Sequence, residues 1–136
     1  MRVFLDANIL FSAARSDGAV RTMLQLLVDH GHDCRADAYV VAEARRNLTA
    51  KGPQALDVLD ELLADLQIAA ASPAAEQRRE LDWLPEQDRP VLAAAIRLAC
   101  DVLVTGDRTH FGPGCGQTFG GVTIHSPRSL VEQLLA

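Results

Sequence analysis

The stretch RVFLDANIL, residues 2–10, is the part of the sequence on which the fold depends. It holds three consecutive large apolar residues, Val3 to Leu5, followed at once by an acid, Asp6. A short apolar run of this kind is typical of a strand that is buried on both faces of a parallel sheet. Open α/β sheets bind their ligands beyond the carboxyl ends of the strands, which is the position of Asp6. We therefore expect the rest of the chain to bring further carboxylates to this point.

Strand-like and helix-like segments alternate along the chain. The strand-like segments are residues 3–5, 32–35, 68–71, 101–104 and 122–124. The helix-like segments are residues 19–30, 38–48, 56–66, 73–84, 88–100 and 127–135. Residues 112–121 hold five of the nine glycines and are predicted to form a loop. This alternation predicts a parallel sheet with helices on both faces, and the absence of a repeat or linker predicts one domain over residues 1–136.

Composition narrows the class of protein. At 136 residues and 49% hydrophobic, the chain can bury a core. No apolar run approaches the ~18 residues of a membrane span, and the N-terminus has no secretory signal, so we expect a cytoplasmic protein without membrane contact. The three cysteines are widely spaced and argue against a disulfide framework or zinc ribbon. The net charge of −5 argues against passive nucleic-acid binding but agrees with acids gathered at a metal site.

Four acids are candidate metal ligands. Asp6 and Asp107 each follow a predicted strand, Asp88 heads the apolar stripe of a predicted helix, and Glu43 flanks the stripe of another. Each also has a simpler interpretation, because Asp6 and Asp88 suit helix N-caps, Asp107 suits a turn, and Glu43 suits a solvated helix face. Helix periodicity alone does not select Glu43.

If these acids converge, their mutual repulsion has to be relieved. Two carboxylates ~4 Å apart repel by about 4 kcal/mol at an effective dielectric of 20. A cluster of them must therefore bind cations or take up protons. Oxygen ligands favour Mg²⁺ or Mn²⁺, and such a site suits attack of water on a phosphodiester.

In these residues the chain resembles the PIN-domain family of metal-dependent ribonucleases, which includes VapC-type toxins of toxin–antitoxin modules. The resemblance rests on four motifs that appear in order along nearly the whole chain. These are Asp6-Ala7-Asn8, Ala42-Glu43-Ala44-Arg45, Asp88 before Val91-Leu92-Ala93-Ala94-Ala95, and Thr105-Gly106-Asp107. The final stretch, from Gly120 to Arg128, is also similar to family members.

The resemblance implies a single three-layer α/β/α domain with a Rossmann-like sheet of about five parallel strands. It implies that Asp6, Glu43, Asp88 and Asp107 bind one or two Mg²⁺ or Mn²⁺ ions, and this is what selects Glu43. It also implies that metal-activated water cuts RNA to leave a 5′-phosphate and a 3′-hydroxyl. A cognate antitoxin and a homodimer are the partners it implies, with the leucine-rich helix 56–66 as either a dimer interface or core.

One position departs from the family pattern, and several others have supporting roles. Many relatives carry a second acid at the position of His110, and histidine ligates Mn²⁺ better than Mg²⁺. His110 is thus either a ligand or a loop residue without metal contact. Ser12 and Thr105 either line the pocket or satisfy local backbone groups, and Asn8 either hydrogen-bonds and orients Asp6 or shapes the turn. The cations nearest the acids in sequence, as candidates for RNA binding or merely solvated, are Arg45, Arg46 and Arg108.

Two other functions compete with a ribonuclease. The first is a non-catalytic binding or regulatory module with the same fold and a weak metal site, which agrees with His110, the acidic charge and the low aromatic share of 4%. The second is a phosphatase or receiver-like domain with Asp6 as a covalent nucleophile. We rank the second lower, because Lys51, the only lysine, lies far in sequence from any predicted strand end, and Asn8 replaces the second aspartate of the phosphatase pattern.

Overall fold

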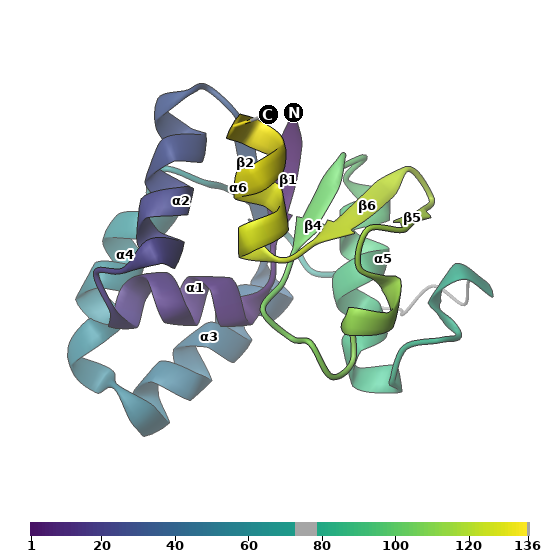
Figure 1. Ribbon diagram of the computed structural model, residues 1–136. Coiled ribbons are helices and arrows are strands. Elements are labelled where there is room, and N and C mark those ends of the chain that lie inside the picture. Colours follow the sequence, from purple (N-terminus) through teal and green to yellow (C-terminus); the bar gives the residue numbers. More distant parts are fainter. Residues whose placement is uncertain (73–78, 136) are drawn as a thin grey trace.

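The computed structural model describes residues 1–72 and 79–135, which contain one six-stranded sheet with the order β3-β2-β1-β4-β6-β5 (Figure 1). The neighbouring strands are parallel except for β5, which is antiparallel to β6 at one edge. The strands are β1 (Arg2–Leu5), β2 (Asp33–Asp37), β3 (Gln67–Ala69), β4 (Val102–Val104), β5 (Thr118–Phe119) and β6 (Val122–His125).

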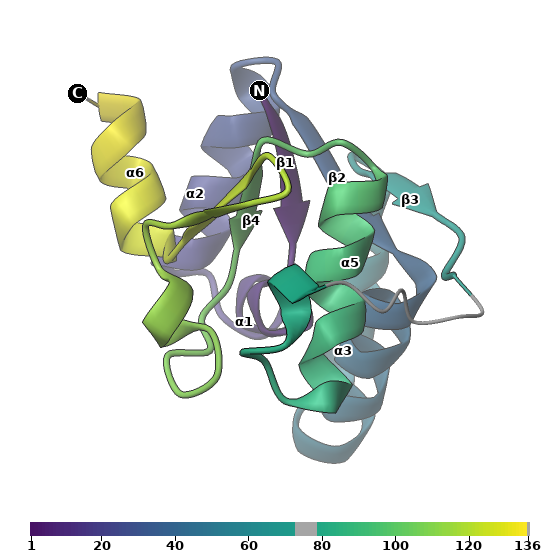
Figure 2. The same cartoon turned by 90° about the vertical axis from the view of Figure 1, so that its right-hand side faces the viewer.

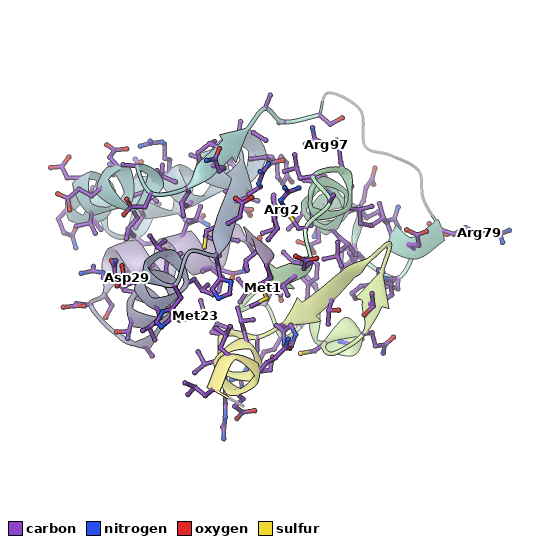
Figure 3. All side chains as sticks on the ribbon, turned by 90° about the horizontal axis from the view of Figure 1, so that it is seen from above. Met1, Arg2, Met23, Asp29, Arg79 and Arg97 are labelled. Atoms are coloured by element: carbon purple, nitrogen blue, oxygen red, sulfur yellow. The ribbon has the colours of Figure 1, made fainter. Side chains whose placement is uncertain are left out.

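Helices cover both faces of this sheet, so that the predicted three-layer α/β/α architecture is confirmed. Helix α5 lies on one face and α2 and α6 lie on the other (Figures 2 and 3). The α-helices are α1 (Ala7–Arg15), α2 (Ala19–Asp29), α3 (Ala38–Lys51), α4 (Leu56–Leu63), α5 (Arg89–Arg97) and α6 (Pro127–Leu135). The short 3-10 helices are η1 (Pro53–Ala55), η2 (Arg79–Leu81), η3 (Glu86–Asp88) and η4 (Gly112–Gly114). Within the described residues, no helix has the length and apolar character needed to cross a membrane.

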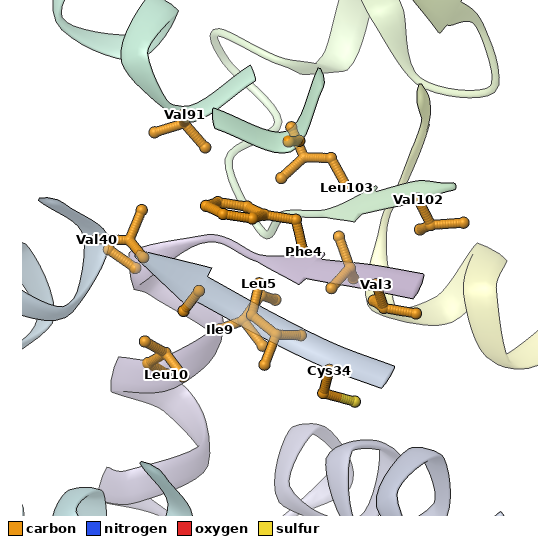
Figure 4. Packing of buried hydrophobic residues seen from close by; sticks show 14 of the residues in the cluster. Val3, Phe4, Leu5, Ile9, Leu10, Cys34, Val40, Val91, Val102 and Leu103 are labelled. Atoms are coloured by element: carbon orange, nitrogen blue, oxygen red, sulfur yellow. The ribbon is translucent and has the colours of Figure 1, made fainter. Parts of the chain in front are cut away.

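The central strand β1 supplies the middle of the core. Val3, Phe4 and Leu5 have no exposed surface, because β2 and β4 pair with β1 on either side and helices cover both faces. Phe4 points to the face of α5, beside Val91, whereas Leu5 points to the opposite face (Figure 4). Fully burying such side chains contributes about 1.5–3 kcal/mol each, which explains an uninterrupted apolar run in place of an alternating one.

The five predicted strands are confirmed, and the differences concern the segments between them. The predicted loop 112–121 contains η4 and the edge strand β5. Helix α1 begins directly after Asp6, and no glycine or proline separates it from β1. The leucines of α4 are packed against the core, Leu59 fully and its neighbours partly, which favours the core interpretation of residues 56–66.

The predicted helix over residues 73–84 is wrong in its described part. Residues 73–78 lie outside the described residues, and residues 79–84 form η2 followed by a turn with i→i+3 hydrogen bonds. The ring of Trp83 stacks on Phe119 with centroids 4.9 Å apart and meets Phe111 edge-on at 6.2 Å. The apolar residues here thus pack against the loop and strand before β6, in a turn rather than along one face of a regular helix.

Candidate metal centre

The strand order reverses between β1 and β4. Strands β2 and β3 lie on one side of β1, whereas β4 and β6 lie on the other. Leu5 pairs with Val104 at the ends of the two strands, and the backbone N–H of Asp6 donates to the carbonyl of Val104 at 3.1 Å. In open α/β sheets, ligands bind in the crevice at such a switch point. The loops that carry Asp6 and Asp107 therefore start side by side, as the sequence predicts.

Asp6 is both a helix cap and a buried anion, with only 5% of its surface exposed. Its Oδ1 accepts from the backbone N–H of Ala7 at 2.7 Å and caps α1, while its Oδ2 accepts from Thr105 Oγ1 at 2.7 Å and Asn8 Nδ2 at 3.1 Å. Burial raises the pKa of the Asp6 carboxyl from 3.8 to about 6; the hydrogen bonds oppose this rise, and the charge of Glu43 adds to it. A nearby cation would therefore stabilise the charged form.

Asn8, in the first turn of α1, and Thr105 join the start of α1 to the loop after β4. The amide of Asn8 donates to Thr105 Oγ1 at 3.3 Å, and its Oδ1 accepts from the backbone N–H of Gly106 at 2.7 Å. Thr105 Oγ1 also accepts from the N–H of Asp107 at 3.1 Å while it donates to Asp6. Thr105 thus satisfies a local backbone group, one of its two predicted roles, and at the same time ties the two acids into one arrangement.

Asp88, Asp107 and His110 converge next to these loops. His110 Nδ1 lies 2.8 Å from Asp88 Oδ2 and 3.1 Å from Asp107 Oδ2. One ligand atom from each of the three residues lies within 4.8 Å of the other two. Among the described residues, the buried Asp88 Oδ2 has no hydrogen-bond partner of regular geometry, and His110 Nδ1 is its close neighbour at 2.8 Å. Burial raises the pKa of Asp88, which the adjacent His110 partly opposes.

Helix α3 brings Glu43 to the same place. Glu43 is partly buried, and its charge acts on Asp6. Tyr39 lies four residues earlier, one helical turn away on the same face, and its hydroxyl donates to the carbonyl of Gln87 at 2.9 Å. Burial raises the pKa of Tyr39, and the charges of Glu43, Asp88 and Asp6 add to this rise. The tyrosine ring therefore lies among three of the four predicted acids.

Tyr39 is a residue of the site that sequence reasoning missed. Its signals were its spacing of four from Glu43 and its status as the only tyrosine of the chain. Neither signal indicates a functional residue without the knowledge that residues 86–88 pack against the start of α3.

The remaining predicted residues lie around the cluster to different degrees. Ser12 is exposed on α1, and no described hydrogen bond joins its side chain to the acids. Arg45 pairs with Asp60 of α4 at 2.7 Å, which directs its charge toward that helix. Arg46 is exposed on α3, and its charge lowers the pKa of Tyr39. Arg108 is exposed in the loop after β4. An RNA-binding role for these arginines stays a prediction.

Asp37 shows what a structural acid at a strand end looks like in this fold. It is the last residue of β2, is 2% exposed, and caps α3 by accepting from the N–H of Val40 at 3.1 Å. Burial raises its pKa, and the cation of Arg97, 3.8 Å away, opposes that rise. Asp37 thus has an arginine as counter-charge, whereas Asp6 has the negative Glu43 nearby.

The donor set fits a divalent cation. Asp88 and Asp107 offer carboxylate oxygens, which suit Mg²⁺ or Mn²⁺, and His110 adds an imidazole nitrogen, whereas Asp6 and Glu43 are not part of this group of three. The buried Asp88 Oδ2 without a hydrogen-bond donor is the kind of orphaned atom that a cation satisfies. A metal ion held by these groups can activate water and stabilise charge on a phosphodiester.

Comparisons with known proteins agree with this fold. The family model described as PIN domain matches residues 2–109. A chain of the crystal structure of VapBC2 from Rickettsia felis bound to a promoter DNA fragment is 22% identical with a TM-score of 0.68, over 93% of this chain and 98% of that one. The same coverage holds for DNA-bound VapBC from Salmonella typhimurium, 15% identical with a TM-score of 0.65. It holds also for FitAcB from Neisseria gonorrhoeae, 18% identical with a TM-score of 0.65. Among curated proteins, none matches the chain.

Proposed function

The chain belongs to the PIN-domain family, and on that premise we propose that it is a divalent-metal-dependent endoribonuclease that hydrolyses RNA phosphodiester bonds. One observation carries this proposal. His110 Nδ1 lies beside both Asp88 and Asp107, and Asp6, on which the charge of Glu43 acts, is tied to the Asp107 loop through Thr105, which supports a shared site for four acids. The four acids are Asp6, Glu43, Asp88 and Asp107.

The acids would hold Mg²⁺ or Mn²⁺, which when bound supplies a Lewis acid and an activated water. Asp6 Oδ2 already accepts two hydrogen bonds and Oδ1 accepts one, which leaves Asp6 one lone pair on Oδ1 to offer. Thr105 and Asn8 keep this carboxylate from rotating. Asp107 is held in the same way, because its Oδ1 accepts from the N–H groups of Thr109 and His110 and its Oδ2 faces the site.

The substrate class follows from charge and from the shortage of aromatic side chains. With an aromatic share of 4%, base stacking contributes little, so the chain would hold RNA through its phosphates. Arg46 and Arg108, both exposed, are the cations we propose for this contact. RNA binding through phosphates weakens as salt rises, and an RNA substrate agrees with the expected cytoplasmic location.

We further propose that the chain is the toxin of a toxin–antitoxin module with a cognate antitoxin as its partner. The VapBC structures from two bacteria, both bound to DNA, support this role through a shared fold. A homodimer stays a prediction. The second candidate function is a non-catalytic module of the same fold, which His110 favours because it replaces an oxygen ligand with a nitrogen.

Cleavage of RNA by the purified chain tests the proposal. We expect cutting with Mn²⁺ or Mg²⁺, none with a chelator, and products that carry a 5′-phosphate. Asp6→Asn should abolish cutting, whereas Asp37→Asn, a buried strand-end acid outside the cluster, should retain it. Cutting that survives Asp6→Asn would contradict the proposal and indicate a contaminant or another site, and absence of both cutting and divalent-ion binding would favour the non-catalytic module.

A further inference from the structure

Backbone hydrogen bonds to Asp107 fix the position of His110, independently of the contacts of its side chain. Its N–H donates to Asp107 Oδ1 at 3.0 Å, as does the N–H of Thr109 at 3.1 Å. This turn fixes the residue three positions after Asp107 over the second carboxylate oxygen. The imidazole then places Nδ1 between two carboxylates, 2.8 Å from Asp88 and 3.1 Å from Asp107.

The geometry points to His110 Nδ1 as a third protein ligand, which makes this a mixed nitrogen–oxygen centre that selects transition-metal dications such as Mn²⁺ over Mg²⁺. This inference rests on the proposed function and names its metal. It applies to the Asp88–Asp107–His110 triad, whose ligand atoms lie within 4.8 Å of one another.

Ligand chemistry gives the direction of the selectivity. Imidazole suits transition metals, whereas Mg²⁺ is held by carboxylates, carbonyls and water. Asp88 Oδ2 is buried and accepts no hydrogen bond within the described part of the chain, and the nearby His110 Nδ1, 2.8 Å away, is itself a proposed ligand. The His110 side chain is 38% exposed, which leaves its other ring nitrogen able to reach water while Nδ1 faces inward.

The same contacts have one rival explanation. Protonated His110 would act as a fixed cation that neutralises Asp88 and Asp107, and it would then compete with every metal ion for these oxygens. The two explanations predict opposite effects of removing the side chain. A ligand contributes affinity for Mn²⁺, whereas a competing cation reduces the affinity for Mn²⁺ and Mg²⁺ alike.

Titration of His110→Ala with Mn²⁺ and Mg²⁺ distinguishes the metal-ligand explanation from the competing-cation explanation. With the full chain stripped of metal, we expect Mn²⁺ affinity, read from the free-ion electron paramagnetic resonance signal, to fall about tenfold to a hundredfold. Mg²⁺ affinity, read by competition, should change by less than about threefold, so the preference for Mn²⁺ narrows. His110→Asp should narrow it further by restoring an oxygen donor. The control His30→Ala changes an exposed histidine at the end of α2 and should leave both affinities unchanged.

A spectroscopic readout makes the test independent of affinity and of catalysis. Pulsed electron paramagnetic resonance of bound Mn²⁺ should show ¹⁴N modulation from the imidazole, present in His30→Ala and lost in His110→Ala. An unchanged preference without ¹⁴N modulation, or tighter binding of both ions in His110→Ala, would overturn the inference while RNA cleavage and the proposed function stand. If neither ion binds the original chain and no RNA is cut, the proposed function itself fails.

Discussion

Burial of Asp6 should make the metal-free protein lose stability as the pH rises from mild acid to neutral. The pKa of this carboxyl is about 6 in the folded state against 3.8 in the unfolded chain. Because the folded pKa is the higher one, the contribution of Asp6 to stability is fully present below pH 3.8 and is lost as the pH rises through 6. A difference of ~2.2 pKa units corresponds to about 3 kcal/mol, of which roughly 1.3 kcal/mol falls between pH 5 and pH 7.

Asp6→Asn removes this titration and keeps the helix cap. With the cap kept, the asparagine oxygen replaces Oδ1 and accepts from Ala7, whereas its amide nitrogen replaces Oδ2, so Asn8 and Thr105 both lose their acceptor at a cost of about 1–3 kcal/mol each. This cost offsets the removed charge at neutral pH. The informative quantity is therefore the pH dependence of the unfolding free energy, which should be smaller in Asp6→Asn than in the original chain by about 1.3 kcal/mol between pH 5 and pH 7.

Urea unfolding in the presence of chelator measures this difference. Trp83 is the only tryptophan, and its packing on Phe119 and Phe111 makes its fluorescence a probe of the folded state. Saturating Mn²⁺ should reduce the pH dependence of the unfolding free energy of the original chain, because a cation favours the charged carboxylate. In the control Asp37→Asn, Mn²⁺ should reduce the pH dependence of the unfolding free energy by the same amount as in the original chain. Identical pH dependence in the original chain and Asp6→Asn would show that Asp6 is not the titrating group.

Three further substitutions test contacts around the site. Thr105→Val removes the hydroxyl that donates to Asp6, so it should lower the free energy of unfolding in urea by about 1–3 kcal/mol and raise the pKa of the Asp6 carboxyl further. An unchanged pH dependence of the unfolding free energy would show that this hydrogen bond does not affect the Asp6 carboxyl. Tyr39→Phe removes a hydrogen bond to η3 and should cost about 0.5–1.5 kcal/mol and slow RNA cleavage, measured side by side. Gly114→Ala would place a Cβ 2.5 Å from the ring of Trp83, so we expect about 1–3 kcal/mol of destabilisation and altered tryptophan fluorescence.

The strands and two of the acids could be predicted because they depend on local sequence and on a general rule of topology. The apolar runs before Asp6 and Asp107 indicate buried strands, and parallel neighbours deliver their next residues to one crevice. Asp88 could be placed by its phase on the apolar stripe of α5. These three positions required no knowledge of distant contacts.

Glu43 and Tyr39 could not be selected in this way. Both lie on the flank of the apolar stripe of α3, and a flank faces solvent in most helices. Here residues 86–88 pack against that flank, as the hydrogen bond from Tyr39 to Gln87 shows, and this contact spans 48 positions of sequence. The family resemblance identified Glu43 because it carries information about such contacts, and it gave none about Tyr39.

The helix predicted over residues 73–84 is wrong in its described part because this segment also depends on contacts with residues distant in sequence. The turn at Trp83 depends on Phe119, which lies in an edge strand of two residues within a glycine-rich stretch. Neither partner carries a local signal strong enough to indicate the other.

Calorimetric titration of the metal-free chain with Mn²⁺ tests most directly whether the acids form one cation-binding pocket. We predict saturable binding by the original chain, binding at least about tenfold weaker in Asp107→Asn, and unchanged binding in Asp37→Asn. Equal binding by the original chain and Asp107→Asn, or no binding by either, would mean that the acids do not form such a pocket.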